Sequence, residues 1–299
     1  MSDAQIRPNL FIVGASKCGT TAWVEYLCGH PDVLFSNPKE PHFFTTDSPR
    51  HRRVADMKAY LRLFESAQSK KIIGDGSASY LYSTEAAANI RSFNPAAKII
   101  IFLREQEAYL PSWHNELCKN GAENVEDFET AWRMSGRRDG SNTTDRCSDL
   151  RFLDYKSCGR FSEQVERFFA NFPREQIRVF HFRDWTPNPR STYLEILSFL
   201  GLQDDSRVEF RPVNQGKRLR SKWLARLLSR PPRIATVIAR SFKAVTGVSV
   251  WVLAGKLAQI NLRKGYVSPV SDALKEEIRL HYKTDNARME AKLRRPTYA

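Results

Sequence analysis

Four short, nearly continuous apolar runs separated by helix-like patterns constrain the fold of this 299-residue chain more than any other feature. The runs, all rich in Ile, Val or Phe, are NLFIVG (9–14), KKIIGD (70–75), KIIIFLR (98–104) and QIRVFHF (176–182). Such runs are typical of strands buried on both faces of a parallel sheet. Strands that alternate with helices predict an α/β fold: a central, mostly parallel sheet flanked by helices in three layers, with right-handed crossovers.

Helical patterns are found between and after these runs. They are TTAWVEYLCG, DMKAYLRLFESA, TEAAANIRSF, VEDFETAWRMSG, GRFSEQVERFFANF and STYLEILSFLG, followed by a terminal helix after residue 267. Ligands of parallel sheets bind outside the carboxyl ends of the strands. We therefore expect GASKCGTT, GDGSAS and REQEAYLPS, which each follow a predicted strand, to converge on one crevice, and residues 135–158 to form a long surface loop beside it.

The segment GASKCGTT (14–21) has the glycine spacing of a phosphate-binding loop, but its lysine is displaced. In the nucleoside-triphosphate pattern the lysine directly follows the second glycine, whereas here Thr20 and Thr21 follow Gly19 and the lysine is Lys17. Amide groups at a helix N-terminus favour an anion, and glycines let a phosphate approach. The sequence predicts a P-loop-like anion site, although a glycine-rich turn without a ligand is the simpler alternative.

The positive charge of the chain is concentrated near its C-terminus. The net charge is +14, and residues 206–299 hold 21 of the 47 Lys and Arg but 6 of the 33 Asp and Glu. From Arg211 to Ser271 there are 13 basic residues and no acidic one. This run is either a solvated basic face or a surface for an anionic partner such as an acidic glycan, an anionic lipid surface or nucleic acid.

Cysteine usage and apolar segments favour a cytoplasmic protein. The five cysteines form no C-x-x-C motif and no ligand-spaced cluster, so neither a disulfide framework nor a metal site is predicted. The opening MSDAQIRPNL lacks the pattern of a signal peptide. The uncharged run Ala244–Gly255 falls well short of the roughly 20 residues that span a bilayer. We expect a cytoplasmic chain, in peripheral contact with the inner face of the membrane if residues 211–264 bind anionic lipid.

Several motifs together resemble a known family. They are SKCGTT with Trp23 shortly after it, HPDVLFSNPKEPHFF, FLREQEAYLPSWHNE, CGRFSEQVERFFANFPREQIRVFHFRDW, LEILSFLGL and VNQGKRLRS. The chain resembles the sulfotransferases that use 3′-phosphoadenosine 5′-phosphosulfate (PAPS), particularly bacterial members related to heparan sulfate N- and 3-O-sulfotransferases. The likeness covers roughly residues 8–225. We accordingly expect residues 1–225 to form the α/β domain and residues 226–299 to form a basic, mostly helical segment packed on it.

The resemblance implies a role for the first loop. Lys17, Cys18, Gly19, Thr20 and Thr21 would bind the 5′-phosphate of PAPS, and Lys17 would neutralise charge on the leaving phosphate oxygen. A phosphosulfate has no γ-phosphate for a lysine placed after the second glycine. No metal is expected in this family.

Other positions would hold the 3′-phosphate and cover the nucleotide. Arg104 and Ser112 have the spacing that the family uses for the 3′-phosphate, with Ser112 at the start of a helix that begins at Pro111. Arg104 as a surface ion-pair partner is the alternative. Gly216, Lys217 and Arg218 would form a second lid over the nucleotide.

The motif KEPHFF supplies the candidate general base. By resemblance Glu40 would accept the acceptor's proton, with His42 as its partner, although a histidine before two phenylalanines is also a common packing residue. Lys39 is expected to face solvent. Asp75 and Ser77, in GDGSAS, are expected to face the cleft.

One departure from the family concerns a lysine. Where glycan sulfotransferases often carry Glu-Lys-Thr or Glu-Lys-Ser, with the lysine positioning the sulfuryl group, this chain has Gly76. Either Lys17 carries that charge alone, or a basic residue from the C-terminal region enters the site.

The predicted function is transfer of a sulfuryl group from PAPS to a hydroxyl or amine of an anionic or polar glycan or glycolipid. Two alternatives stay open. One is a magnesium-dependent P-loop kinase or NTPase that uses Asp75, against which the displaced lysine counts. The other is a non-catalytic basic module that binds polyanions; nucleic acid is not expected as a partner, because Trp223, Phe242 and Trp251 resemble packing residues.

Overall fold

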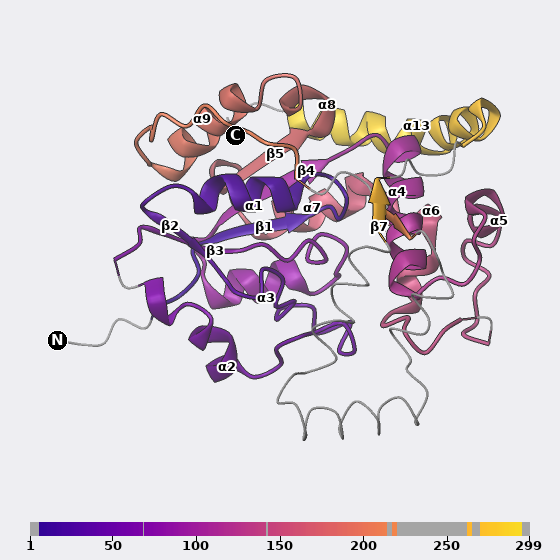
Figure 1. The fold of residues 1–299 in the computed structure, drawn as a ribbon, viewed down its shortest axis with the longest axis horizontal. Coiled ribbons are helices and arrows are strands. Elements are labelled where there is room, and N and C mark those ends of the chain that lie inside the picture. Colours follow the sequence, from indigo (N-terminus) through magenta and orange to yellow (C-terminus); the bar gives the residue numbers. More distant parts are fainter. Residues whose placement is uncertain are drawn as a thin grey trace, which may run out of the picture. The chain divides into compact units, whose positions relative to one another are not determined.

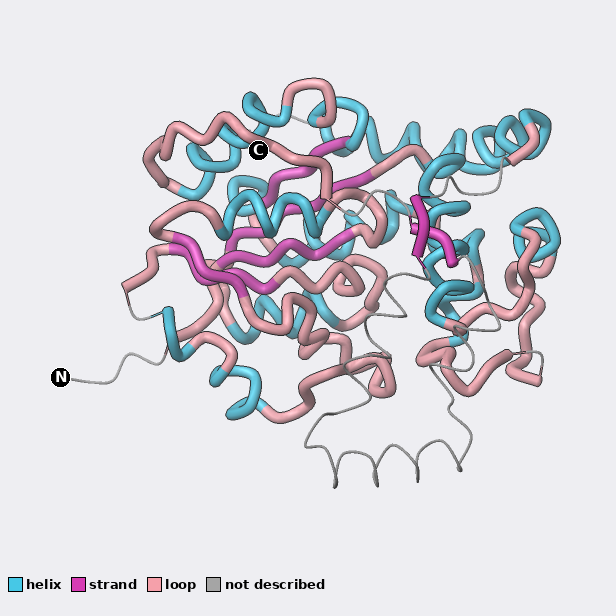
Figure 2. The backbone as a smooth tube through the Cα atoms, viewed as in Figure 1, coloured by secondary structure: helices cyan, strands magenta, loops and turns pink. Residues whose placement is uncertain are grey.

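The computed structural model of the chain describes residues 6–67, 69–141, 143–213, 217–219, 262–264 and 270–294. A five-stranded parallel sheet lies at its centre, in the order β2-β3-β1-β4-β5 (Figures 1 and 2). The strands are β1 (Leu10–Gly14), β2 (Val33–Phe35), β3 (Ile72–Asp75), β4 (Lys98–Leu103) and β5 (Ile177–His181). The predicted α/β fold is therefore confirmed, and β2 is the strand that the sequence analysis missed because its three residues are too few to show a period.

Helices connect and follow the strands. They are α1 (Thr20–Cys28), α2 (Met57–Arg62), α3 (Ala86–Phe93), α4 (Gln106–Asn120), α5 (Phe128–Arg133), α6 (Tyr155–Cys158), α7 (Phe161–Asn171), α8 (Phe182–Trp185), α9 (Pro189–Leu200) and α13 (Asp272–Arg294), with 3-10 turns at Glu65–Ala67, Leu150–Leu153 and Arg174–Gln176. Among the described residues, no helix is both long and apolar enough to cross a membrane.

Right-handed crossovers decide which face of the sheet each helix covers. The chain moves one way from β1 through α1 to β2, but the opposite way from β3 through α3 to β4, so α1 and α3 lie on opposite faces. On the first face, Trp23 of α1 stacks on Phe102 of β4 and meets Trp185 of α8 edge-on. On the other face α3 packs against α7. Both layers bury β1 completely and leave only the first residue of β4 partly exposed.

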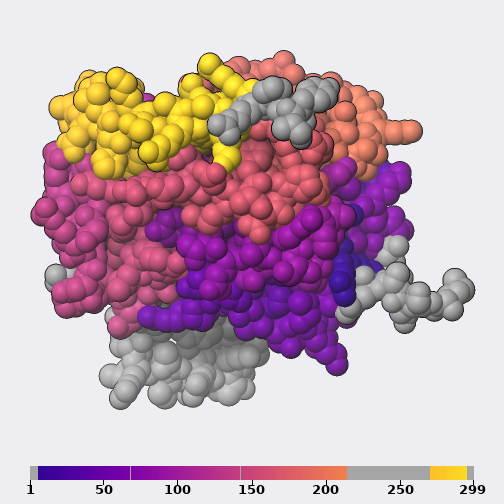
Figure 3. All heavy atoms as spheres, turned by 180° about the vertical axis from the view of Figure 1, so that it is seen from behind, coloured from indigo at the N-terminus to yellow at the C-terminus, as the bar shows by residue number. Residues whose placement is uncertain are grey.

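Helix α13 returns to this same unit although it is remote in sequence (Figure 3). It packs on α4 and α7 through one face, formed by Leu274, Ile278, Tyr282 and Met289. The Tyr282 hydroxyl donates to the carbonyls of Tyr155 and Lys156, at 3.0 Å each. Side chains of α13 thereby fix the segment that leads into α7.

The described strands β6 (Lys217–Leu219) and β7 (Leu262–Lys264) pair antiparallel and belong to a second unit. The boundary predicted at residue 225 lies outside the described residues, as does most of the basic run. The division into a domain of residues 1–225 and a segment of residues 226–299 therefore stays a prediction.

Candidate active site

The loop between β1 and α1 lies at the point of the sheet where the connections from neighbouring strands run in opposite directions. From the carboxyl end of β1 the chain leaves towards β2, whereas from neighbouring β4 it leaves towards β5. A ligand crevice is expected at such a switch point. The predicted loops GASKCGTT, GDGSAS and REQEAYLPS follow β1, β3 and β4, which are adjacent strands, so they do meet at one edge.

Gly19 is required by the shape of this loop. Its φ of 93° lies in the left-handed region, and a Cβ at this position would lie 2.4 Å from a ring carbon of Trp185. Gly19 caps α1, and no side chain hydrogen-bonds to the cap of that helix. The amide groups of the first turn of α1 therefore have no capping side chain from Gly19, and amides at such a helix start favour an anion.

Two lysines from different parts of the chain flank this helix end. Lys17 Nζ lies 3.0 Å from Glu116 Oε2 of α4. Lys39 Nζ lies 3.4 Å from Thr20 Oγ1 and 3.3 Å from Thr21 Oγ1. The expectation that Lys39 faces solvent is wrong, because its side chain is only 22% exposed and its ammonium contacts both threonines.

Glu40, the candidate base, is held beside Lys39. The Lys39 ammonium donates to Glu40 Oε1 at 3.0 Å. Burial is the largest single influence and raises the pKa of Glu40, but the charges and hydrogen bonds of its neighbours, Lys39 first among them, together outweigh it and leave the pKa below its ordinary value. Glu40 is thus ionised at neutral pH and has an oxygen with which to accept a proton.

His42 is neutral and tightly held. Burial, followed by neighbouring His51, lowers the pKa of His42 to about 3. Its Nδ1 lies 2.7 Å from Ser79 Oγ, and its Nε2 lies 3.7 Å from Glu40 Oε2. His42 has a φ of 52°, unusual for a non-glycine residue, and its backbone amide donates to Ser77 Oγ at 3.0 Å. His42 therefore orients the Glu40 loop and does not carry a charge at neutral pH.

Asp75 anchors that loop from beneath. Its carboxylate accepts hydrogen bonds from the hydroxyls of Tyr60 and Tyr80, each at 2.8 Å, and from the amide and hydroxyl of Ser77 at 3.0 and 2.7 Å. Asp75 and Ser77 are fully buried, so the expectation that they face the cleft is wrong. With two donors on each oxygen, Asp75 is occupied as a structural group, which disfavours it as a magnesium ligand.

Arg104 lies beside the first loop. It follows β4, its guanidinium stacks 4.6 Å from the Phe182 ring centre, and its charge partly offsets the effect of burial, which raises the pKa of the Cys18 thiol. The predicted helix start is wrong: α4 begins at Gln106, and Pro111 lies inside it. Ser112 is therefore in the second turn of α4, where it cannot offer the free amides of a helix start.

The remaining predicted nucleotide contacts lie in the second unit. Gly216 is outside the described residues. Lys217 and Arg218 are in β6, of which the structure describes the backbone. Their predicted contact with the nucleotide is untested.

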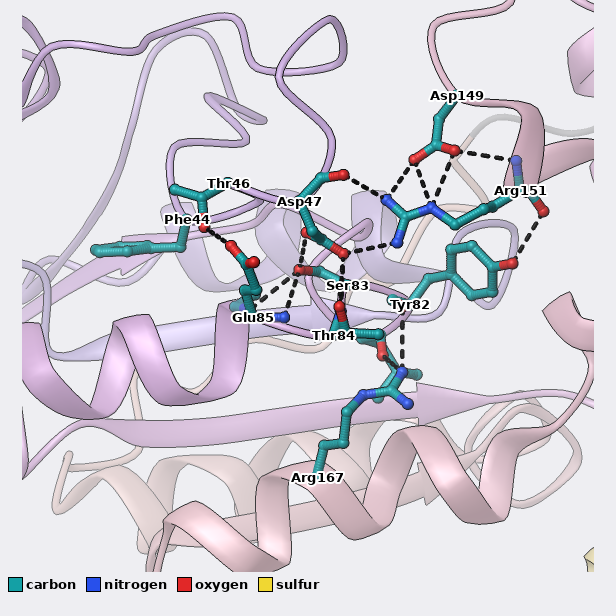
Figure 4. A network of polar contacts seen from close by, with 12 residues as sticks. Phe44, Thr46, Asp47, Tyr82, Ser83, Thr84, Glu85, Asp149, Arg151 and Arg167 are labelled. Carbon is teal, nitrogen blue, oxygen red and sulfur yellow. Dashed lines mark hydrogen bonds and ion pairs between the residues drawn. The ribbon is translucent and has the colours of Figure 1, made fainter.

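A polar network ties the segment after His42 to the long loop that precedes α6 (Figure 4). Arg151 donates to the Asp149 carboxylate, to Asp47 Oδ2 at 2.8 Å and to the Asp47 carbonyl at 2.8 Å. Asp47 also accepts from Ser83 and Thr84. In the same region Ser148 Oγ lies 3.0 Å from His51 Nδ1, so this segment borders the candidate site. The prediction of one long surface loop over residues 135–158 is wrong at its C-terminal end, where Leu150–Leu153 form a 3-10 turn and Tyr155–Cys158 form α6.

Sequence reasoning missed three residues of this arrangement. Glu116 is the last residue of the motif FLREQEAYLPSWHNE, and His51 lies outside the motifs. Nothing in the spacing of either residue indicates its contact with Lys17 or His42. Lys39 lies in the KEPHFF motif. The sequence signal that could have found it is Gly76, because the absence of the family's lysine at that position indicates that another cation takes its place.

Fold and site together define an α/β protein in which a glycine-containing loop, two lysines and an ionised carboxylate meet at the carboxyl ends of the parallel strands. The sequence matches the family described as "Sulfotransferase domain" over residues 7–220. The chain belongs to this sulfotransferase family.

Individual relatives agree. The crystal structure of a sulfotransferase from Alicyclobacillus acidocaldarius has a TM-score of 0.61 and 25% identity, with 83% of this chain and 99% of that chain covered. Human bifunctional heparan sulfate N-deacetylase/N-sulfotransferase 3 is 27% identical over 205 residues, which are 65% of this chain and 22% of the relative. Mouse carbohydrate sulfotransferase 15 is 24% identical over 249 residues, covering 65% of this chain and 44% of the relative. The chain thus matches less than half the length of these last two proteins.

Proposed function

We propose that this protein transfers a sulfuryl group from PAPS to a hydroxyl or amine of a carbohydrate or glycolipid. The observation that carries the proposal is that the uncapped start of α1, Lys17, Lys39 and the ionised Glu40 gather at one edge of the sheet in a sulfotransferase domain. The names of the two carbohydrate-directed relatives support a glycan acceptor.

Sulfuryl transfer requires stabilisation of the charge on the leaving phosphate and one proton transfer from the acceptor. The acceptor's oxygen or nitrogen attacks sulfur, a new bond to sulfur forms, and the bond from sulfur to the bridging oxygen breaks. The electron pair of that bond goes to the leaving phosphate, whose charge Lys17 and the α1 amides offset. Glu40 takes the acceptor's proton. Arg104 would bind the 3′-phosphate, since a guanidinium presents paired donors to a phosphate.

Calorimetric titration with adenosine 3′,5′-bisphosphate, the product nucleotide, tests donor binding. Without magnesium, we expect tight binding that Lys17→Ala/Arg104→Ala weakens strongly. The control Lys71→Ala/Arg91→Ala removes the same charge just before β3 and in the last turn of α3, at the opposite edge of the sheet, and should bind normally. A preference for magnesium-ATP would instead support the kinase alternative.

Turnover separates an enzyme from a binding module. With PAPS and carbohydrate acceptors, Glu40→Gln should keep nucleotide binding and lose transfer. Steeply salt-dependent polyanion binding without transfer by the wild type would favour the non-catalytic alternative. Membrane contact through residues 211–264 stays a prediction, because most of those residues lie outside the described part of the chain. The cytoplasmic location also stays a prediction.

A further inference from the structure

Lys39 comes from the loop after β2, yet its ammonium lies at the start of α1. Within 3.4 Å it contacts three oxygens: those of Thr20, Thr21 and Glu40. Two of these belong to the threonines expected to bind the donor's phosphate, and the third belongs to the candidate base. No other described lysine joins the helix start to Glu40 in this way.

Gly76 gives the Lys39 side chain its path. A Cβ at position 76 would lie 3.3 Å from Lys39 Cε, 3.4 Å from Lys39 Cγ and 2.8 Å from Val24 Cγ2. The stem of Lys39 therefore packs across the place that a side chain at position 76 would fill. A side chain at position 76 would therefore require Val24 and the Lys39 stem to shift from their present positions.

Lys17 is less directly placed for the same task. Its ammonium is paired with Glu116, which also accepts from Lys119 and Asn120. Lys39 instead contacts the threonine hydroxyls themselves. Both ammonium groups are in ion pairs of 3.0 Å, but of the two it is Lys39 whose ammonium already contacts hydroxyls at the start of α1.

We propose that Lys39 binds the sulfuryl end of the donor in place of the lysine that Gly76 replaces. The inference depends on the proposed function. When the donor binds, its oxygens take over the Lys39 ammonium from Glu40. Loss of that ion pair raises the proton affinity of Glu40, so donor binding prepares the base for the acceptor's proton.

The first test is Lys39→Met, which removes the charge but keeps a stem of similar length. Affinity for PAPS should fall at least about tenfold, as expected for a lost charge-assisted hydrogen bond, while adenosine 3′,5′-bisphosphate, which lacks the sulfuryl group, should lose clearly less. Lys71→Met, at an exposed lysine before β3, is the matched control and should bind both nucleotides normally.

A double-mutant cycle tests the role of Gly76. Gly76→Ala should weaken PAPS binding in the wild type by displacing Lys39, and should have little further effect in Lys39→Ala. If Gly76→Ala costs as much in both backgrounds, its effect comes from Val24 and the packing argument is overturned.

The outcomes distinguish this inference from the proposed function. If the wild type binds adenosine 3′,5′-bisphosphate but Lys39→Met binds PAPS as tightly as the wild type, Lys39 is not the sulfuryl ligand and the sulfotransferase proposal stands. If the wild type binds neither nucleotide, both proposals fail.

Discussion

Lys17 Nζ forms an ion pair of 3.0 Å with Glu116 Oε2, which joins the loop between β1 and α1 to α4. The two side chains are about a quarter exposed, and burial and the nearby lysines act in opposite directions on Glu116, leaving its pKa below the ordinary value. The carboxylate therefore stays charged at neutral pH and, under the proposed function, would compete with the donor for the Lys17 ammonium.

Glu116→Gln should tighten the binding of adenosine 3′,5′-bisphosphate. Removal of a negative charge beside Lys17 releases its ammonium, and if the partly buried pair contributes about 1 kcal/mol, the gain should be roughly fivefold. Calorimetry measures it directly. The control Glu163→Gln lies in the exposed pair with Arg160 and should leave the affinity unchanged. Weaker binding by Glu116→Gln would mean that the pair positions Lys17 for the donor.

Asp75→Asn should change how stability depends on pH. Burial raises the pKa of Asp75 to about 6, from 3.8 in the unfolded chain, although its hydrogen bonds act in the opposite direction. Between these values the folded protein binds more protons, so this group's contribution to the free energy of unfolding falls as pH rises. From pH 4 to pH 6.5, the free energy of unfolding of the wild type should therefore fall by about 2 kcal/mol relative to that of Asp75→Asn.

Denaturant unfolding at both pH values measures this difference for Asp75. Glu195→Gln, at an exposed position of α9, should show no such change. Parallel pH curves for wild type and Asp75→Asn would contradict the raised pKa.

The wild type compared with His42→Asn should show the opposite pH dependence of the free energy of unfolding. The pKa of His42 falls from 6.5 to about 3 on folding, because burial disfavours the imidazolium. The folded state then binds fewer protons, so its stabilising contribution is present above pH 6.5 and is lost as pH falls. From pH 7 down to pH 5, the free energy of unfolding of the wild type should fall by about 2 kcal/mol relative to that of His42→Asn. Chemical denaturation at the two pH values tests this, and a gain of relative stability in acid would refute it.

Arg151→Lys should loosen the loops around the site. An ammonium cannot reproduce the paired donation to Asp149 together with the contacts to the Asp47 carboxylate and carbonyl. The loss of several charge-assisted hydrogen bonds should cost about 1–3 kcal/mol of the free energy of unfolding. Thermal unfolding compares it with Arg160→Lys, whose ion pair is exposed and should contribute less than about 1 kcal/mol. Equal melting temperatures for the two variants would show that the network of Figure 4 adds little stability.

The sequence alone determined the sheet and the family, because both are written in local patterns. The apolar runs that became β1, β3, β4 and β5 are long enough to display their character, whereas the three residues of β2 are too few, and the motifs that indicate the family are continuous stretches of sequence. Tertiary structure decided what depends on chain segments remote in sequence: the burial of Asp75, the pairing of Lys17 with Glu116, and the approach of Lys39 to α1 past Gly76. Sequence spacing could not show these, because a long side chain's partner is set by which loops meet at the sheet edge, and that is fixed only when the layers pack.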